Sequence, residues 1–123
     1  MSLSYVINPE KSHVQVFGAG KVTMPAMIEI IQKVAADSRF SPQFTVIFDL
    51  RGVQYTAELA DGDALATVLR QRKNNFQNRF AVVVPEHLQV LAKLYCLLAN
   101  MGGFDKIMPF TDMVKAGEWL SAR

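Results

Sequence analysis

Cysteine, histidine and long apolar runs are scarce in this sequence, and each scarcity argues against a class of protein. Cys96 is the only cysteine in 123 residues, so no intrachain disulfide can form, which agrees with a reducing compartment. The two histidines, His13 and His87, are too few and too scattered to predict a metal site. No apolar run approaches the roughly 18 residues of a membrane-spanning helix, and the first residues lack the basic segment and long apolar run of a signal peptide, so we expect none. We therefore expect a cytoplasmic protein with no integral membrane segment.

Strong net charge is also missing. The formal net charge is +2, far below the balance expected of a dedicated nucleic-acid-binding domain, so we expect no nucleic-acid partner. The densest basic stretch contains Arg70, Arg72 and Lys73, near the end of an expected helix, where positive charge complements the helix dipole. These three residues are also a candidate docking patch for an acidic partner or an anionic lipid headgroup.

Hydrophobic residues make up 50% of the chain, which is enough for a core, and the length fits a single domain over residues 1–123. Alternating and continuous apolar runs predict strands at residues 4–7, 13–17, 45–48, 80–84 and 106–110. Helical spacing predicts helices capped by Thr23 and Thr111, one starting at Asp61 and running to residue 75, and one over residues 86–100. The glycines at 18 and 20 are expected to break or bend the second strand, and residues 49–52 to end the third.

The resulting order, ββαβαβαβα, predicts an α/β fold. Strands that alternate with helices form a mainly parallel sheet, and the first two strands form an antiparallel hairpin. We therefore expect a five-stranded mixed sheet with four helices. Pro109 lacks a backbone donor, which favours an edge position for the last strand.

The sequence contains no convincing set of catalytic residues. Cys96 could act as a nucleophile with His13 or His87 as its base, but it lies within an apolar segment, where burial makes a thiol inert. His87 is nine positions earlier in the same expected helix, on the other side of its axis. We predict no catalytic residue, no metal site and no cofactor.

The helix expected at residues 86–100 is apolar nearly all round. Such a helix is normally buried on more than one side, and a domain of this length has little room for that. It therefore either packs centrally, or its outer face meets a second subunit, a lipid or an apolar ligand. A homodimer is one of these expectations.

Residues 45–53, Thr-Val-Ile-Phe-Asp-Leu-Arg-Gly-Val, resemble the third-strand signature of STAS domains, which include the SpoIIAA-type anti-sigma factor antagonists. Residues 37–42 and 116–120, Asp-Ser-Arg-Phe-Ser-Pro and Ala-Gly-Glu-Trp-Leu, are more similar to a bacterial branch of small uncharacterised SpoIIAA-like proteins. That branch is grouped with STAS and Sec14-like lipid-binding folds. The resemblance covers most of the chain and implies the SpoIIAA-like fold.

The phosphorylatable serine of STAS domains has no counterpart here. Aligned from Asp49, the serine-bearing stretch falls on residues 57–60, Ala-Glu-Leu-Ala. Thr56 is the only nearby hydroxyl, and Glu58 already carries a charge where phosphorylation would add one. The resemblance therefore implies an interaction module without the serine switch.

Three functional readings follow, in decreasing order of support. The first is a non-catalytic protein-interaction or regulatory module, with partner-binding residues Asp49, Arg51, Thr56, Glu58, Asp61 and Asp63. The second, from the Sec14-like side of the resemblance, is a binder of an apolar small molecule or lipid, with a pocket against Tyr95, Leu98, Met101 and Phe104. The third is an enzyme.

Overall fold

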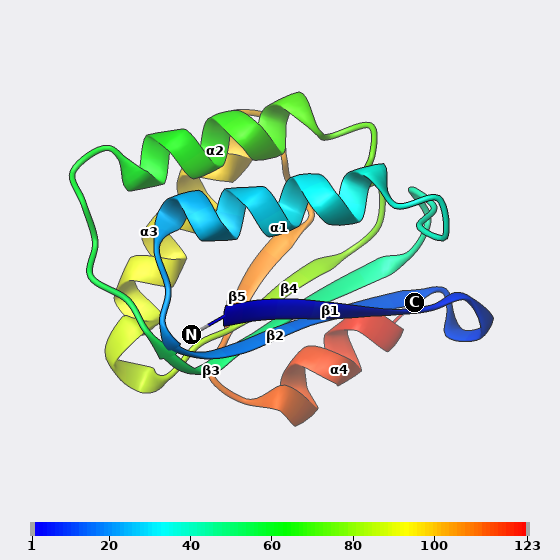
Figure 1. Cartoon of the computed structure of the whole chain (residues 1–123), viewed down its shortest axis with the longest axis horizontal. Coiled ribbons are helices and arrows are strands. Elements are labelled where there is room, and N and C mark those ends of the chain that lie inside the picture. The colour runs from blue at the N-terminus through cyan, green and yellow to red at the C-terminus, as the bar shows by residue number, and fades with distance from the viewer. Residues whose placement is uncertain (1, 123) are drawn as a thin grey trace.

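A five-stranded mixed sheet forms the centre of the molecule (Figure 1). The computed structural model describes residues 2–122, so the ends of the expected 1–123 domain lie outside the described residues. The strands are β1 (Ser2–Asn8), β2 (His13–Lys21), β3 (Thr45–Gln54), β4 (Phe80–Val83) and β5 (Ile107–Phe110). The helices are α1 (Met24–Ala36), α2 (Asp61–Gln71), α3 (Gln89–Met101) and α4 (Met113–Ser121). Two short 3-10 turns, η1 (Pro9–Lys11) and η2 (Glu86–Leu88), precede β2 and α3.

The strands lie in the order β1-β2-β3-β4-β5, and only the β1–β2 pair is antiparallel. The predicted element order, the N-terminal hairpin and the mixed sheet are therefore confirmed. Pro109 lies on the edge strand β5, opposite Val82, so its missing donor leaves no gap in the middle of the sheet.

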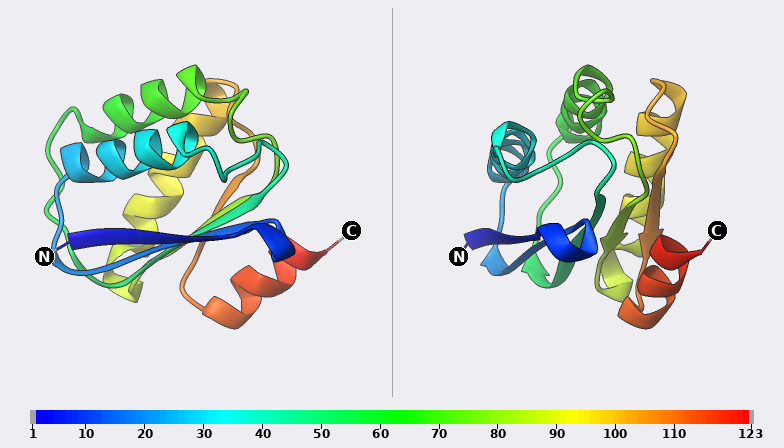
Figure 2. Two further views of the ribbon diagram at one scale, coloured as in Figure 1. Left: turned by 45° about the vertical axis from the view of Figure 1, so that its right-hand side comes forward. Right: turned by 90° about the vertical axis from the view of Figure 1, so that its right-hand side faces the viewer.

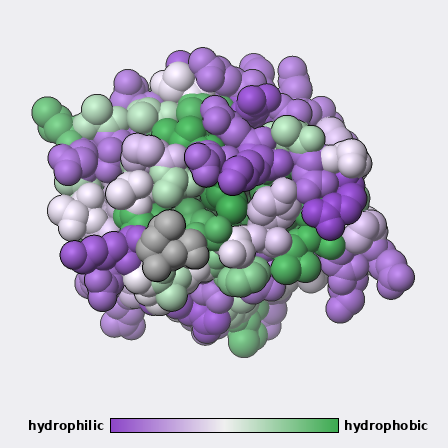
Figure 3. Space-filling model, in the orientation of Figure 1, coloured by the Kyte–Doolittle hydropathy of each residue, from purple (hydrophilic) through white to green (hydrophobic). Residues whose placement is uncertain are grey.

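Helices α1, α2 and α3 cover one face of the sheet, and α4 alone lies on the other (Figure 2). The larger core cluster joins the three helices to one face of the strands and includes Val14, Phe48 and Phe80. The smaller cluster joins α4 to β3 and β4 through Ile47, Ala81, Val83 and Ala116. Strands β3 and β4 have buried apolar residues on both faces where helices cover both faces, as with Phe48 and Ile47 of β3. Hydrophobic side chains show between α1 and the sheet in Figure 3, within a mainly hydrophilic surface.

The second and third strands are longer than predicted. Residues 18–20 do not break β2, and residues 49–52 do not end β3, because Ala19, Gly20 and Lys21 pair with Gly52, Val53 and Gln54. A register shift between Phe17 and Ala19 absorbs the irregularity, and Gly20 takes a φ of 78°, which favours glycine. Of the two expectations for these glycines, a break or a bend, the structure has an irregular register within a continuing strand and no break.

Two predicted helix starts also need correction. Thr23 caps α1 as expected, through a 3.3 Å bond from the Ala26 N–H. Asp112, and not Thr111, caps α4, where its Oδ1 accepts from the Val114 N–H at 2.7 Å. Asp61 is the first residue of α2 and not its cap, and α2 ends at Gln71, before the expected residue 75. Within residues 2–122 no helix is both long enough and apolar enough to cross a membrane.

Candidate binding site beneath the 56–60 loop

The segment between β3 and α2 follows the carboxyl end of a parallel strand, where sites in such sheets are found (Figure 1). Residues 56–60, called here the 56–60 loop, are all exposed, and the Leu59 side chain is 105% exposed. On either side of this loop, Tyr55 is half-buried and Asp61 is buried. The loop is thus an exposed surface with both of its ends fixed.

Asp61 fixes the loop by hydrogen bonding back across it. Its Oδ2 accepts a short hydrogen bond from the Tyr55 hydroxyl and a 2.9 Å bond from the Glu58 N–H. The Asp61 N–H in turn donates to the Glu58 carbonyl at 3.1 Å. Within residues 3–122, Asp61 is the only charged side chain that is buried. Its position in the first turn of α2 also places negative charge at the positive end of the helix dipole.

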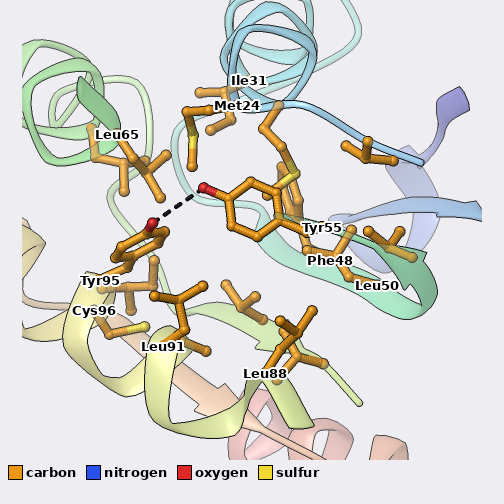
Figure 4. Close-up of a pocket in the computed structure, with 18 of the residues that line it drawn as sticks. Met24, Ile31, Phe48, Leu50, Tyr55, Leu65, Leu88, Leu91, Tyr95 and Cys96 are labelled. Atoms are coloured by element: carbon orange, nitrogen blue, oxygen red, sulfur yellow. Dashed lines mark hydrogen bonds between the residues drawn. The ribbon is translucent and has the colours of Figure 1, made fainter. Parts of the chain in front are cut away.

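Tyr95 on α3 extends this network. Its hydroxyl lies 3.1 Å from the Tyr55 hydroxyl, and the two rings meet edge to face at 80° (Figure 4). Because the single proton of Tyr55 is donated to Asp61, Tyr95 must be the donor to Tyr55. Burial, and then the bonds to Asp61 and Tyr95, raise the pKa of Tyr55 well above its usual value, so it stays a neutral donor. The network joins the end of β3, the start of α2 and the middle of α3.

Close contact between α2 and α3 depends on Gly62. A Cβ atom placed there would lie 2.9 Å from both the Leu98 Cδ1 and the Tyr95 Cε1 atoms, which is too short for carbon atoms in contact. Glycine therefore lets the first turn of α2 rest directly on the tyrosine that supports the loop.

A cavity of about 70 Å³ lies behind the two tyrosines, between the sheet and helices α1, α2 and α3 (Figure 4). Its wall includes Met24, Ile31, Phe48, Leu50, Leu65, Leu88, Leu91 and Cys96. One water needs about 10–15 Å³, so the space exceeds a single water, but walls of this kind offer water few partners. Tyr55 and Tyr95 are lining residues with hydroxyl groups, and these two hydroxyls bond to each other. The arrangement is suited to a small apolar molecule.

The Cys96 thiol in this wall is not activated. Burial raises its pKa to about 12, so the thiol is protonated at neutral pH. His13 lies on the α4 side of the sheet, where its Nδ1 is 2.7 Å from the Thr45 Oγ1, and His87 is exposed on η2. The structure therefore does not bring Cys96 together with either histidine. Within residues 2–122 no group of His, Cys, Asp and Glu is arranged to hold a metal ion.

The expected partner-binding residues fall into two groups. Thr56, Glu58, Asp61 and Asp63 lie together in the 56–60 loop and the first turn of α2. Asp49 and Arg51 do not join them, because they alternate with Phe48 and Leu50 along β3 and face the α4 side of the sheet.

Asp49 and Arg51 instead form a pair on that face. The Arg51 Nε and Nη2 donate to the two Asp49 carboxylate oxygens, each at 2.8 Å. These bonds hold the pKa of Asp49 below its usual value. Together with Ser4 and Phe17, the pair lines a shallow hollow on the surface. This hollow shares no residue with the apolar cavity.

The basic residues lie at the other end of α2 from the 56–60 loop. Arg70 is exposed beside the end of α3, where a Cβ atom on Gly102 would lie 3.4 Å from its Nη1. Lys73 is exposed in the turn after α2, and Arg72 is half-buried. The candidate anionic docking patch is therefore a feature of its own and not part of the loop site.

The expected apolar pocket is not formed by the four residues proposed for it. Tyr95 lines the cavity, but Leu98 packs towards Gly62, and Met101 is 76% exposed. Phe104 is buried in an aromatic cluster, 5.8 Å from Phe80 between ring centroids. Helical periodicity explains the correction, because Met101 points to the opposite side of α3 from the cavity.

Sequence reasoning missed Tyr55 and the wall residues from α1 and α2. Tyr55 had a signal, since it directly follows a buried strand and precedes the acidic start of α2 by six residues. Met24 and Leu65 had none, because only tertiary packing brings those helices to one cavity.

Comparison with known proteins identifies a solved structure with a similar fold. No protein-family model matches the chain, and no curated protein does. A solved structure of an uncharacterised DUF3478-family protein with a SpoIIAA-like fold, from Shewanella loihica PV-4, matches 97% of this chain and 94% of its own. The TM-score is 0.61 and the sequence identity is 20%. The fold is therefore SpoIIAA-like, as the sequence resemblance predicted, and the function of that neighbour is not characterised.

Proposed function

We propose that this chain is a non-catalytic regulatory module that binds a protein partner through the 56–60 loop and the first turn of α2. The observation that carries the proposal is that the loop is exposed over its whole length yet is held at both ends by the buried Asp61. Binding through an already ordered loop avoids the entropy cost of fixing a flexible one.

The chemistry of the surface indicates the kind of partner. Leu59 projects an apolar side chain, and the exposed Glu58 and Asp63 carry negative charge beside it. A complementary surface would have an apolar pocket for Leu59 with basic residues around it. Because the loop already has the acidic residue Glu58 in place of a phosphorylatable serine, binding should not depend on phosphorylation of this loop.

A pull-down from cells of the source organism tests the proposal. The wild-type chain should recover a protein that the double variant Leu59→Ser, Glu58→Lys loses. Val114→Ser is the matched control, because Val114 is 69% exposed on α4, away from the loop. Equal recovery by all three chains would remove the loop as the docking site. Thr56→Ala should recover the partner as well as wild type does.

The cavity behind the tyrosines supports a second candidate, a binder of an apolar small molecule. Its volume of about 70 Å³ lies among aliphatic and aromatic side chains rather than at a polar surface. An NMR titration with xenon, an apolar atom small enough for the cavity, should shift resonances of the wall, and native mass spectrometry should reveal any molecule retained during gentle purification.

The variant Ala92→Leu should block this binding, because Ala92 is buried in the wall and leucine would fill part of the space. Ala57→Leu in the exposed loop is the matched control and should leave binding unchanged. Unaltered xenon-induced shifts in Ala92→Leu, in a chain that melts normally, would exclude the cavity as the binding site.

A further inference from the structure

The solvent side of α3 carries an apolar stripe. Val90, Leu94, Leu97 and Met101 are 81%, 49%, 56% and 76% exposed, and they share one face of the helix. The opposite face holds the buried Ala92, Cys96 and Ala99. In the right-hand view of Figure 2, α3 lies at one end of the row of three helices, with α1 at the other end. The helix is thus apolar both towards the core and towards solvent.

Such a stripe is unusual for a surface helix. The solvent face of an amphipathic helix is normally polar, and a continuous apolar patch usually marks an interaction surface. The stripe residues are separated by four, three and four positions, which is the spacing that lets two helices interlock their side chains along a common seam.

We propose that this stripe binds the same stripe on a second copy of the chain, with the two α3 helices antiparallel. A two-fold axis between positions 95 and 96 sets Leu94 against Leu97 of the partner subunit and Val90 against Met101 of the partner subunit. The first contact joins side chains of equal size, and the second joins a short side chain to a long one. The stripe therefore complements itself when reversed.

Charge favours a second copy over a membrane surface. Helices that lie in a membrane interface carry many lysines and arginines on their polar face. On α3, Lys93 is the only charged residue. In the antiparallel arrangement Lys93 comes beside Asn100 of the partner subunit, and the two helix dipoles oppose each other.

The contact is small. A helix of the length of α3, 13 residues, extends about 20 Å, and one helix face covers less than the roughly 800 Å² per partner of a standard interface. The dimer should therefore be weak, forming in the micromolar range and reversing on dilution.

Sedimentation equilibrium of the full chain, from low micromolar to millimolar concentration, tests the inference. Wild type should pass from monomer to dimer, and Leu94→Glu should raise the dissociation constant at least about tenfold, a loss of about 1.4 kcal/mol. Val114→Glu, at an exposed apolar position on α4, is the matched control and should dimerise like wild type. A wild-type chain that stays monomeric throughout, or a dimer that Leu94→Glu leaves intact, overturns the proposal.

Disulfide trapping tests the orientation, in a Cys96→Ala background that removes the native thiol. Mixed Leu94→Cys and Leu97→Cys chains of different mass should form the heterodisulfide in preference to either homodisulfide. Predominant homodisulfides would show a parallel pairing and overturn the antiparallel one. Binding of a monomeric wild-type chain to phosphatidylglycerol vesicles, lost in Leu94→Glu, would assign the stripe to a membrane instead. The Leu59→Ser, Glu58→Lys chain should dimerise normally, which separates this inference from the proposed docking function.

Discussion

At the residue scale, the Tyr55 hydroxyl group is expected to stabilise the candidate site through its bond to Asp61. In Tyr55→Phe, the Asp61 carboxylate keeps only its bond from the Glu58 N–H. A buried acceptor that loses a partner costs about 1–3 kcal/mol, and urea unfolding should show a loss of that size. Tyr95→Phe is the matched control, because it leaves the Tyr55–Asp61 bond in place and should cost less. Equal losses in the two variants would mean that Asp61 does not depend on Tyr55.

A second residue-scale prediction concerns acid stability and Asp37. Its carboxylate accepts from the Arg39 Nε and Nη2 and from the Tyr5 hydroxyl, which together hold its pKa well below the usual value. A carboxyl with a lowered pKa in the folded state contributes stability above its unfolded pKa of about 3.9 and loses it as pH falls towards the folded value.

The fall in the free energy of unfolding between pH 7 and pH 3 should therefore be smaller in Asp37→Asn than in wild type. Glu29→Gln is the control, because Glu29 pairs with Lys33 at an exposed helix surface and should change the pH dependence little. An unchanged acid profile in Asp37→Asn would show that solvent screens the Arg39 pair.

At the scale of elements, the α2–α3 contact is predicted to be sensitive to one methyl group. Gly62→Ala puts a Cβ atom against Leu98 and Tyr95 and should cost about 1–3 kcal/mol as the helices separate. Gly117→Ala is the opposite case, because a Cβ atom there meets nothing within 4 Å in α4. It should stabilise the chain by about 0.5–1 kcal/mol. Thermal or urea unfolding of both variants checks the pair, and a neutral Gly62→Ala would mean that α2 can move away freely.

The elements also show what a sequence can predict about this fold. Apolar runs with the period of a strand or of a helix were sufficient for the order of the elements, because that periodicity is local to each run. The glycines of β2 left two outcomes open, because whether a glycine breaks a strand or forms a bulge depends on the neighbouring strand, here Gly52 and Val53 of β3. Asp61 misled for a similar reason, because its carboxylate turns back to Tyr55 and not to the free N–H groups of α2.

At the scale of the whole molecule, the sequence predicted where the candidate site lies but not which residues form it. The rule that sites follow the carboxyl ends of parallel strands pointed to the segment after β3. Asp49 and Arg51 were also assigned to the expected site, although they lie within β3 and alternation along that strand places them on the other face of the sheet. The cavity is lined by residues of three helices and of the strands β3, β4 and β5, and no local pattern predicts a distance between α1 and α3.

The unequal layers of the molecule lead to a last prediction. Three helices cover one face of the sheet, whereas α4 holds to the other through a small cluster and through Arg79, which donates to the Trp119 and Ala122 carbonyls and lies over the Trp119 ring. Few buried contacts make a segment open at lower free energy than the core. Amide hydrogens of α4 should therefore exchange faster than those of α1, and Arg79→Ala should speed exchange in α4 without affecting α1. Lys106→Ala is the control, because Lys106 donates to the Gln77 carbonyl and not to α4. The outcome against this prediction is that the amide hydrogens of α1 and α4 exchange at one common rate, both in wild type and in Arg79→Ala. The two helix layers would then open together, and α4 would be as stable as the three helices on the other face.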